Sequence, residues 1–368
     1  MERQRILYVA STASHLKRFH QPYLAAFAEK NQVFTMANGD GVTYPIHFQK
    51  RLFSIVNLRN IGKIRKILRQ GDFDLVLLNT SLAAALVRAA MLGLRRRPYT
   101  RNVVHGYLFS TPVKSLRERV LWLCERLMRR VTDEIVVMND EDLAIAEKYR
   151  FCRGAVRKIN GMGIDWSFAA PSCRDCSFRA HLGVGRDELL CLYVGELNRR
   201  KHQSLLIRAA KRLHEEGIPI RLLLLGAGGE YVRLVREIEI LGAGDYVHLM
   251  GNVEPIAPYL SAADLYLSAS QSEGLPFNVM EAMLAGLPIV ASDVKGQRDL
   301  LVGSDACLYP KNDLDALCSA VRTRYAAGRL GVGCVTYKNI EKYRLSAVFA
   351  RNFAILKGEE KSENRLQD

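Results

Sequence analysis

Residues 265–292 most limit how this chain can fold, because they hold two apolar strand-like runs separated by a single short helix. The first run, Leu265–Ala269, ends at a polar turn, and the second begins at Pro288. Between the runs, residues 277–284 follow a helical pattern, and Gly286 comes directly after it, in the order that ends helices. A strand–loop–helix–strand unit of this kind predicts neighbouring parallel strands and therefore an α/β fold.

Two acidic residues mark this unit as a candidate binding site. Glu273 lies in the loop before the helix, and Glu281 is expected about two turns inside it. Loops at the carboxyl ends of parallel strands form the ligand crevice of such sheets, and a helix N-terminus there suits a phosphate. Glu281 could then accept hydrogen bonds from ribose hydroxyls. The alternative is that Glu281 is an ordinary exposed helix carboxylate and that Glu273 caps the helix N-terminus. We would prefer this alternative if the two acids stood alone, without their neighbouring motif.

The wider segment resembles a known signature. Residues 272–301, SEGLPFNVMEAMLAGLPIVASDVKGQRDLL, are similar to the donor site of the family 4 retaining glycosyltransferases, which have the GT-B architecture. The resemblance implies that Glu273 touches the transferred sugar and that Glu281 holds the nucleotide ribose. It also implies that backbone around Pro276, which has no N–H of its own, faces the sugar and diphosphate. The donor-binding residues implied there are Gly274, Leu275, Pro276 and Phe277.

The loop after the predicted strand Leu190–Val194 carries a second part of this donor site. Lys201 resembles the diphosphate-binding lysine of the family. Glu196 stands where many relatives carry arginine, so Arg199 or Arg200 is expected to compensate for the missing cation, and Arg200 is the candidate for the donor site. After another strand, Asn252 and Val253 are candidates to contact the nucleotide base.

The N-terminal half resembles one bacterial subgroup of the family. Residues 10–24, ASTASHLKRFHQPYL, are similar to the opening of exopolysaccharide and capsule glycosyltransferases, and residues 105–109, HGYLF, match a later segment of that subgroup. His15 is expected in the loop after the first strand, and His20 is expected to be a packed helix residue. The resemblance places His105 on the acceptor or sugar side, although a histidine satisfied within its loop remains the alternative. The acceptor-side candidates are Ser14, His15, Asn79 and His105.

The basic charge is confined to one half of the chain. Residues 1–165 hold 28 Lys and Arg against 14 Asp and Glu, while the remainder is nearly neutral. No zinc-finger, RNP or bZIP pattern accompanies the charge, so we expect no nucleic acid partner. An anionic membrane surface and a diphosphate-bearing acceptor are the expected partners. No apolar run is long enough to span a membrane, and no signal peptide is evident.

Residues 114–131 form an amphipathic pattern within this basic half. Their apolar positions recur at helical spacing, which predicts a core-facing stripe. The stripe consists of Leu116, Val120, Leu123, Leu127 and Val131. The arginines and Trp122 on the remaining surface are interpreted either as a face against anionic lipid or as an ordinary solvated face.

Cysteine and acidic motifs give no sign of a metal site. Eight cysteines are scattered as in a protein of the reducing cytoplasm, and the lone Cys173-x-x-Cys176 pair has no second pair for zinc. The chain has no Asp-x-Asp motif, so we expect neither a metal nor another cofactor, with the sugar nucleotide as co-substrate.

The domain prediction is two Rossmann-like domains that face each other across a cleft. Residues 1–165 are expected to bind the acceptor and residues 166–340 the sugar nucleotide. Residues 341–357 are expected to form a helix that crosses back to the first domain, and residues 358–368 a disordered tail.

The expected enzyme acts at the inner face of the bacterial cell membrane. The resemblance implies transfer of a hexose or N-acetylhexosamine, with retention, from a UDP-sugar to an undecaprenyl-diphosphate-linked sugar in exopolysaccharide, capsule or O-antigen synthesis. The residues expected to carry catalysis are Glu273, Lys201 and His105. A GT-B-fold UDP-sugar epimerase and a non-enzymatic polyanion-binding protein are the alternatives.

Overall fold

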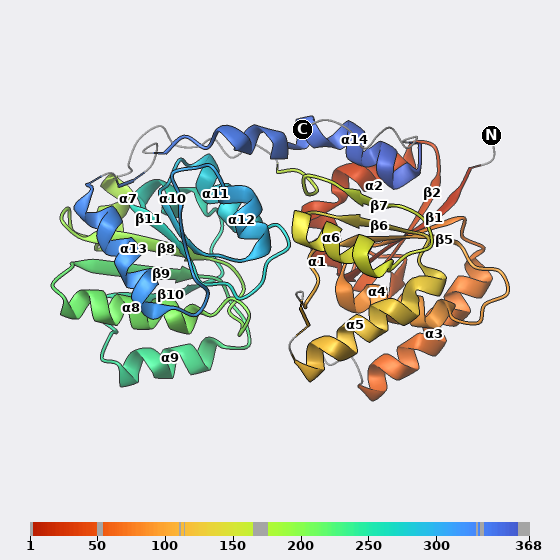
Figure 1. Ribbon diagram of the computed structural model, residues 1–368, viewed down its shortest axis with the longest axis horizontal. Helices are drawn as coiled ribbons and strands as arrows, with labels where there is room; N and C mark the ends of the chain where they lie inside the picture. The colour runs from red at the N-terminus through yellow and green to blue at the C-terminus, as the bar shows by residue number, and fades with distance from the viewer. Residues whose placement is uncertain are drawn as a thin grey trace. The chain divides into compact units, whose positions relative to one another are not determined.

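The structure is a computed structural model that describes residues 3–49, 54–109, 112–113, 115–164, 176–328, 330–331 and 335–359. The chain divides into two compact units (Figure 1). Unit 1 comprises Met1–Gly163 together with Leu345–Asp368, and unit 2 comprises Ile164–Arg344. The predicted boundary at residue 165, Cys173 and most of the predicted tail, residues 360–368, lie outside the described residues.

Unit 1 contains a parallel sheet of seven strands in the order β3-β2-β1-β4-β5-β6-β7. Strand β1, third in this order, is apolar without alternation, and its residues Ile6–Ala10 are fully buried, as expected where helices cover both faces of a sheet. The strands are β1 (Arg5–Thr12), β2 (Gln32–Asn38), β3 (Tyr44–Pro45), β4 (Leu75–Leu78), β5 (Tyr99–Val104), β6 (Glu134–Val137) and β7 (Val156–Lys158). The strand order reverses between β1 and β4, the place where open α/β sheets bind ligands at their carboxyl edge.

Helices cover both faces of this sheet. Figure 1 shows α3, α4 and α5 on one face and α2 with α14 on the other. The helices are α1 (Ala13–Phe19), α2 (Gln21–Ala28), α3 (Ile55–Gly71), α4 (Ser81–Met91), α5 (Leu116–Met128) with the 3-10 turn Arg129–Val131, α6 (Asp140–Tyr149) and α14 (Leu345–Lys357). The core between α3, α4 and the sheet includes Leu7, Val76, Ile64 and Val87.

One part of the sequence prediction for unit 1 is wrong. The stripe Leu116, Val120, Leu123 and Leu127 of α5 does not enter the core, and α5 has no buried residue. Only Val131, beyond the end of α5, is buried. The opposite side of α5 faces α4 and the sheet, because Glu125 pairs there with the buried Arg88.

Unit 2 repeats the architecture with six parallel strands in the order β10-β9-β8-β11-β12-β13. The strands are β8 (Leu189–Val194), β9 (Ile220–Leu225), β10 (Val247–Gly251), β11 (Leu265–Ser268), β12 (Ile289–Ser292) and β13 (Cys307–Tyr309). The helices are α7 (Cys176–His181), α8 (Gln203–Glu215), α9 (Tyr231–Ile240), α10 (Ala257–Ala262), α11 (Phe277–Leu284), α12 (Lys295–Leu301), α13 (Leu314–Ala326) and the 3-10 helix Lys338–Tyr343. The unit is therefore a second doubly wound α/β sheet.

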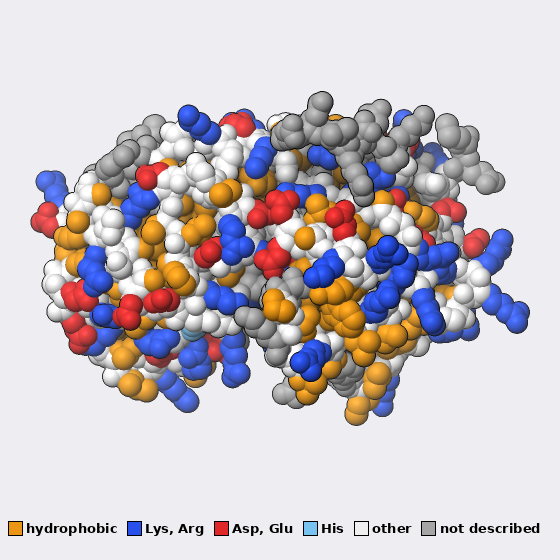
Figure 2. All heavy atoms as spheres, viewed as in Figure 1, with side chains coloured by type: hydrophobic (Ala, Val, Ile, Leu, Met, Phe, Trp, Pro, Cys, Tyr) orange, Lys and Arg blue, Asp and Glu red, His pale blue; other side chains and the backbone are white. Residues whose placement is uncertain are grey.

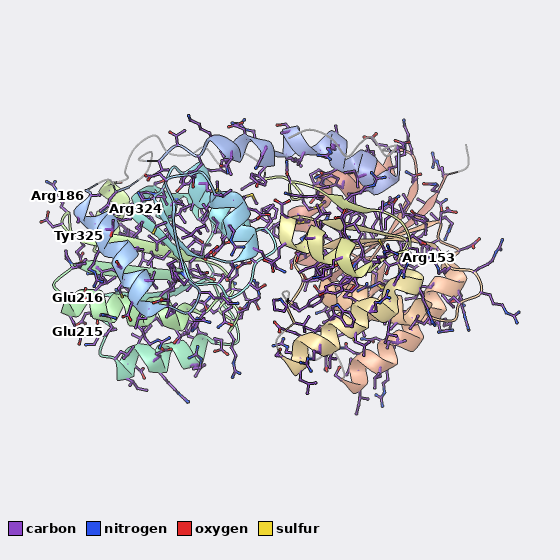
Figure 3. The ribbon with its side chains drawn as sticks, viewed as in Figure 1. Arg153, Arg186, Glu215, Glu216, Arg324 and Tyr325 are labelled. Carbon is purple, nitrogen blue, oxygen red and sulfur yellow. The ribbon has the colours of Figure 1, made fainter. Side chains whose placement is uncertain are left out.

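Charges of both signs pair on the outer surface of unit 2. Glu216, beyond the end of α8, accepts from Arg322 of α13 at 2.7 Å and from Arg212 at 3.3 Å. Figure 3 labels Glu215 and Glu216 close together at this end of α8. Among the described helices of either unit, none has the length and apolar character needed to cross a membrane.

The C-terminal helix α14 packs against α2 within unit 1. The Phe27 and Phe353 rings lie 4.7 Å apart, and buried polar groups fix the contact between the helices. The Asn352 side chain donates to the Tyr23 hydroxyl at 3.0 Å and to the Gly161 carbonyl at 2.7 Å. The Tyr23 hydroxyl donates in turn to the Met162 carbonyl at 3.0 Å. Residues 345–357 thus complete unit 1 although they follow unit 2 in the chain.

We predict that Asn352→Ala destabilises unit 1. The substitution leaves the Gly161 carbonyl and the Tyr23 hydroxyl short of a buried donor, which costs about 1–3 kcal/mol of the free energy of unfolding. Urea denaturation followed by circular dichroism measures the change. Ser346→Ala, an exposed substitution in the first turn of the same helix, is the matched control and should stay close to wild type. Equal stabilities of the two variants would contradict the prediction.

Candidate functional site

A buried carboxylate with three polar partners forms the centre of the candidate site in unit 2. Glu273 Oε1 accepts from Lys201 Nζ at 2.6 Å and from the Ser270 hydroxyl at 2.6 Å. Glu273 Oε2 accepts from Arg200 Nη1 at 2.9 Å. Burial by itself would raise the pKa of Glu273, but Lys201 and Arg200 outweigh that effect and lower it below its usual value. The carboxylate is therefore ionised and neutralised by two cations.

Two neighbouring parallel strands position these residues. Lys201 and Arg200 lie in the loop after β8, Glu273 lies in the loop after β11, and β8 pairs with β11. The loop after β8 also contacts the end of β9 closely, since a Cβ on Gly226 would lie 2.0 Å from the Gly195 carbonyl oxygen. Glycine is required at 226 because any other residue would have both this clash and backbone strain at a φ of 137°. The cations and the carboxylate thus meet at the carboxyl edge of the sheet, where α/β folds bind ligands.

Helix α11 begins directly after this loop and carries Glu281. Glu281 is the fifth residue of α11, so it lies little more than one turn inside the helix, closer to the N-terminus than predicted. Glu281 is half-buried. The pKa of Tyr266 is raised mainly because Tyr266 is buried, and the negative charge of Glu281 adds to the increase. Asn278 fixes the first turn of α11 by donating to the Val194 carbonyl at 2.6 Å and to the Tyr266 hydroxyl at 2.8 Å.

The other predicted donor residues lie around the same edge. Asn252 is exposed and Val253 half-buried, directly after β10. Gly274, Leu275 and Pro276 are buried and Phe277 is half-buried, because this loop packs closely against the start of α12. The closest approach is at Gly296, where an added Cβ would lie 2.1 Å from the Gly274 carbonyl oxygen.

Several residues of this site were missed by the sequence reasoning. Ser270 shares the Glu273 carboxylate with Lys201, and Ser292 donates to the Ser270 carbonyl. Gln297 of α12 forms hydrogen bonds with both Ser292 and Ser268, and all three side chains are buried. Small polar residues at the ends of apolar strands were the available signal, but their sequence positions do not indicate which of them meet.

Unit 1 has its own polar cluster, made of three histidines. His15 lies in α1, His20 lies between α1 and α2, and His105 follows β5. The Nε2 atoms of His15 and His20 are 3.3 Å apart, and the Tyr8 hydroxyl lies 3.1 Å from His20 Nδ1. The His15 and His105 rings contact edge-to-face with centroids 5.1 Å apart. Because β1 and β5 flank β4 in the parallel sheet, the cluster lies at its carboxyl edge.

Burial keeps all three imidazoles neutral at physiological pH. It lowers the pKa of His15 to about 4 and that of His105 to about 3, with His15 contributing to the latter. The pKa of His20 is also lowered well below its ordinary value, first by burial and then by its two histidine neighbours. His105 Nε2 is buried without a hydrogen-bond partner in the described structure. The cluster therefore presents neutral donors and acceptors rather than positive charge.

The structure revises three acceptor-side predictions. The first strand continues to Thr12, so Ser14 and His15 lie in the first turn of α1 and not in a loop. Ser14 is exposed and donates to the Thr12 hydroxyl at 3.2 Å. Asn79 is fully buried and donates to the Val9 and Leu77 carbonyls, so its side chain joins strand ends and offers no surface to a ligand. His20 is buried in the packing of α1 and α2, as predicted.

Among the residues that the structure describes, the three histidines also form a group with the geometry to hold a metal ion. One ring nitrogen from each lies within 4.8 Å of the others, and neutral imidazole is a common ligand for Zn²⁺. No sequence motif predicted this group, because His105 is separated from the other two by a long stretch of chain. The expected absence of a metal stays a prediction.

We predict that the histidine cluster makes unit 1 less stable in mild acid. In the unfolded chain these side chains bind protons near pH 6.5. In the folded state burial lowers the pKa of His15 to about 4 and that of His105 to about 3, and it lowers the pKa of His20 well below its ordinary value. The free energy of unfolding of unit 1 therefore decreases as the pH falls from about 6.5 towards 4, because protons bind more readily to the unfolded chain. Removing one such histidine should flatten the dependence by up to about 1.4 kcal/mol per pH unit.

Urea unfolding of wild type and His15→Gln at pH 7, 6 and 5 measures this effect. Carboxylates titrate in both proteins, so the difference between the two isolates the histidine. His47→Gln, at an exposed position of the same unit, is the control and should parallel wild type. Parallel curves for His15→Gln and wild type would show that the cluster does not resist protonation.

Comparison with known proteins matches each unit to a glycosyltransferase family profile. Residues 7–161 match "Glycosyltransferase Family 4", and residues 188–326 match "Glycosyl transferases group 1". The Bacillus subtilis (strain 168) protein EpsD, which is classed as a glycosyltransferase, is 28% identical over 333 residues, with 88% of this chain and 87% of EpsD covered. An Escherichia coli UDP-Gal:alpha-D-GlcNAc-diphosphoundecaprenol alpha-1,3-galactosyltransferase is 26% identical, with 73% of this chain and 70% of that protein covered.

Solved structures show the same fold. Sucrose-phosphate synthase from Thermosynechococcus elongatus superposes with a TM-score of 0.74 at 19% identity, covering 97% of this chain and 98% of that one. HepE of Anabaena, solved with UDP and glucose, gives a TM-score of 0.73 at 19% identity, covering 96% and 100%. Together with the two parallel sheets and their edge clusters, these matches show that the chain is a glycosyltransferase of family 4 with the GT-B fold.

Proposed function

We propose that this glycosyltransferase moves a hexose or N-acetylhexosamine from a UDP-sugar to a sugar carried on undecaprenyl diphosphate, with retention of anomeric configuration, in exopolysaccharide, capsule or O-antigen synthesis. The observation that carries the proposal is the cluster of Lys201, Arg200 and Glu273 beside the N-terminus of α11. It combines cations, a carboxylate and a helix N-terminus at a sheet edge, which suits a sugar diphosphate.

The donor roles follow from this chemistry. Lys201 and Arg200 supply positive charge to the diphosphate, and Glu281 accepts hydrogen bonds from the ribose hydroxyls. Glu273 orients Lys201 and accepts hydrogen bonds from the transferred sugar. Glu273 pairs with both cations, so a diphosphate that binds them competes with this carboxylate. We propose that the two cations meet the diphosphate charge without a divalent metal.

The assignment of a UDP-sugar has independent support. The galactosyltransferase relative of Escherichia coli is named for UDP-Gal, and the HepE structure holds UDP. Asn252 and Val253 follow β10 on the same edge of unit 2, and we assign them to contact the base.

The acceptor side is assigned to unit 1. The same Escherichia coli relative acts on a diphosphoundecaprenol-linked sugar, and EpsD covers most of this chain. A neutral imidazole can both accept and donate a hydrogen bond, so His15 and His105 suit sugar hydroxyls better than they suit phosphate. We assign His105, whose Nε2 has no partner in the described structure, to contact the reacting sugar.

The proposed reaction is a displacement on one face of the donor sugar. The acceptor hydroxyl oxygen forms a bond to the anomeric carbon as the bond from that carbon to the diphosphate oxygen breaks. The hydroxyl proton passes to the leaving phosphate oxygen, and UDP is released. The protein contributes by positioning both substrates and by stabilising the negative charge that develops on the diphosphate.

An acceptor with a lipid carrier places the enzyme at a membrane surface. We propose that the protein is cytoplasmic and binds peripherally to the inner face of the cell membrane through its basic N-terminal half. The excess of 14 positive charges in residues 1–165 supports this, because anionic headgroups attract such segments.

Replacement of the ribose carboxylate tests the donor assignment. We expect wild type to bind UDP in titration calorimetry and Glu281→Ala to weaken that binding at least tenfold, because hydrogen bonds to a charged group contribute about 1.5–3 kcal/mol. Glu239→Ala, at an exposed position of α9, is the matched control and should bind as wild type does. Equal affinity of Glu281→Ala and wild type would refute the ribose role, and a folded wild type that does not bind UDP would refute the donor.

Removal of the buried ammonium tests the catalytic assignment. Lys201→Met keeps most of the length of the side chain but removes its charge, so we expect kcat to fall by roughly 10²–10³. Lys311→Met, an exposed change in the same unit, should leave the rate unchanged. Thermal unfolding of both variants checks that the fold survives. Proton NMR of the wild-type product establishes the anomer, and incubation of the UDP-sugar without acceptor shows whether the enzyme instead epimerises it.

A further inference from the structure

Helix α5 exposes a continuous apolar stripe on the surface of unit 1. The fractional exposures are 78% at Leu116, 40% at Val120, 50% at Leu123 and 57% at Leu127. Their spacing of four, three and four residues places them on one side of the helix. Large aliphatic side chains so exposed in a row are a recognised sign of an interaction surface, whereas single exposed ones are not.

The orientation of α5 is fixed by contacts on its other side. Arg88 of α4 is 1% exposed, and its Nη1 and Nη2 bond both carboxylate oxygens of Glu125 at 2.8 and 2.7 Å. Leu121 and Trp122 pack against a neighbouring buried cluster, and Met128 packs against another. Turning the apolar stripe inward would leave the buried guanidinium without its carboxylate, which is strongly unfavourable. The stripe therefore faces outward in the folded protein.

Arginines border the stripe on both sides. At 100° per residue, Arg119 and Arg126 lie along one edge of the stripe and Arg117 along the other. Arg130 follows in the 3-10 turn at the end of α5. Figure 2 shows apolar side chains interspersed with Lys and Arg over this part of unit 1. Neither Arg126 nor Arg130 has an acidic partner at ion-pair distance in the part of the chain that the structure describes. This pattern differs from the outer surface of unit 2, where charges of both signs pair.

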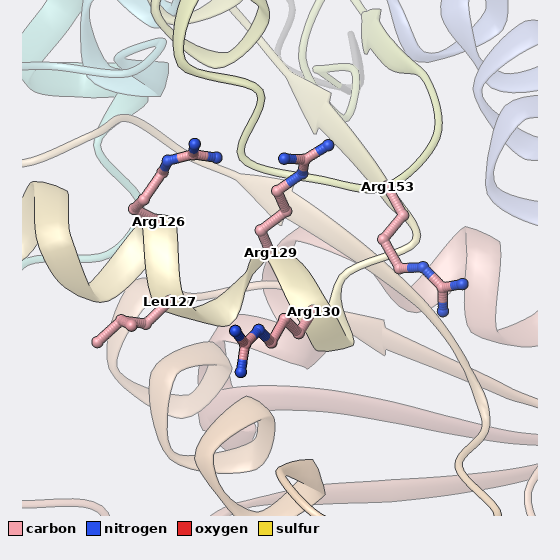
Figure 4. Close-up of a pocket in the computed structure, with 5 residues that line it drawn as sticks. All are labelled: Arg126, Leu127, Arg129, Arg130 and Arg153. Carbon is pink, nitrogen blue, oxygen red and sulfur yellow. The ribbon is translucent and has the colours of Figure 1, made fainter.

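A hollow rich in arginine lies at the C-terminal end of the stripe. It has a volume of about 710 Å³ and is lined by Arg126, Leu127, Arg129, Arg130 and Arg153. In Figure 4, Arg126 and Arg129 extend to the same side of the helix, while Leu127 extends to the other. Arg153 lies 3.8 Å from the Asp133 carboxylate, whereas Arg129 donates to the Cys152 carbonyl, which carries no charge. The positive charge of the hollow is therefore only partly neutralised by the protein. Guanidinium groups in such numbers suit a phosphate group.

We propose that α5 is the element that inserts into the membrane: its apolar stripe enters the acyl layer of an anionic phospholipid monolayer, and the arginines of the adjacent hollow bind lipid phosphates. The proposal rests on the peripheral membrane binding proposed above and names the segment responsible. An apolar stripe bordered by arginines is the pattern of helices that lie in a membrane interface. A second copy of this chain fits the surface less well, because a two-fold interface there would bring the arginines of both copies together.

Vesicle binding of paired variants tests the proposal. We expect wild type to sediment with phosphatidylglycerol-containing vesicles and not with pure phosphatidylcholine. Leu123→Ser combined with Leu127→Ser should lower the partition constant at least tenfold, and the loss should remain at low salt. Arg126→Gln combined with Arg130→Gln should lower it roughly 25-fold at low salt, since each arginine near an anionic surface contributes about fivefold.

The control variants carry changes of the same kinds on unit 2. Val232→Ser with Ile240→Ser removes apolar residues of α9 that are 61% and 84% exposed, and Arg236→Gln removes an exposed charge of the same helix. These proteins should bind vesicles as wild type does. Insertion is measured directly with Leu123→Trp, whose added fluorescence should be quenched by brominated acyl chains.

Three outcomes would overturn the proposal. The first is unchanged vesicle binding by the double leucine variant, and the second is no quenching of the introduced tryptophan. The third is a wild-type dimer in sedimentation velocity that the leucine changes convert to a monomer, which would assign the stripe to a second copy. UDP titration of every variant separates these results from a failure of the donor assignment, because α5 contributes no donor-binding residue.

Discussion

A carboxylate can be buried in a protein only if cations or hydrogen-bond donors compensate it, and Glu273 shows how strongly this constraint shapes unit 2. Its two oxygens accept from Lys201, Arg200 and Ser270, which come from two different loops. Removing one member of such a buried pair typically costs about 3–5 kcal/mol. The cluster therefore fixes the loop after β8 against the loop after β11, and it holds the two cations that the proposed function assigns to the diphosphate.

Unit 1 has the same architecture, but the buried titratable groups at its carboxyl edge are uncharged rather than ion-paired. Its carboxyl edge carries His15, His20 and His105, and burial keeps them uncharged instead of pairing them with acids. In the proposed function, the neutral cluster meets hydroxyl groups of the acceptor, and the ionic cluster of unit 2 meets the phosphates of the donor. Two similar sheets thus acquire different chemistry, which is consistent with one unit binding the acceptor and the other the donor.

The pair of Arg88 and Glu125 has a comparable influence on the surface of unit 1. It points one side of α5 inward and so exposes the leucines on the other side. An ion pair buried beneath the helix, rather than hydrophobicity alone, thereby decides which face meets solvent. Helix amphipathicity is a sound guide to the core only when the polar face has no buried partner of its own.

The sequence by itself determined the α/β class, the position of α11 and the glycosyltransferase family, because strand–loop–helix–strand spacing and the donor signature are local in the chain. It also indicated that Glu273 and Lys201 belong to one site, although it did not show that they pair with each other. The tertiary structure alone decided the outward face of α5, the burial of Asn79 and the meeting of His105 with His15. Each of these depends on residues far apart in sequence, and their pairing follows from strand order and buried charge, which local patterns do not encode.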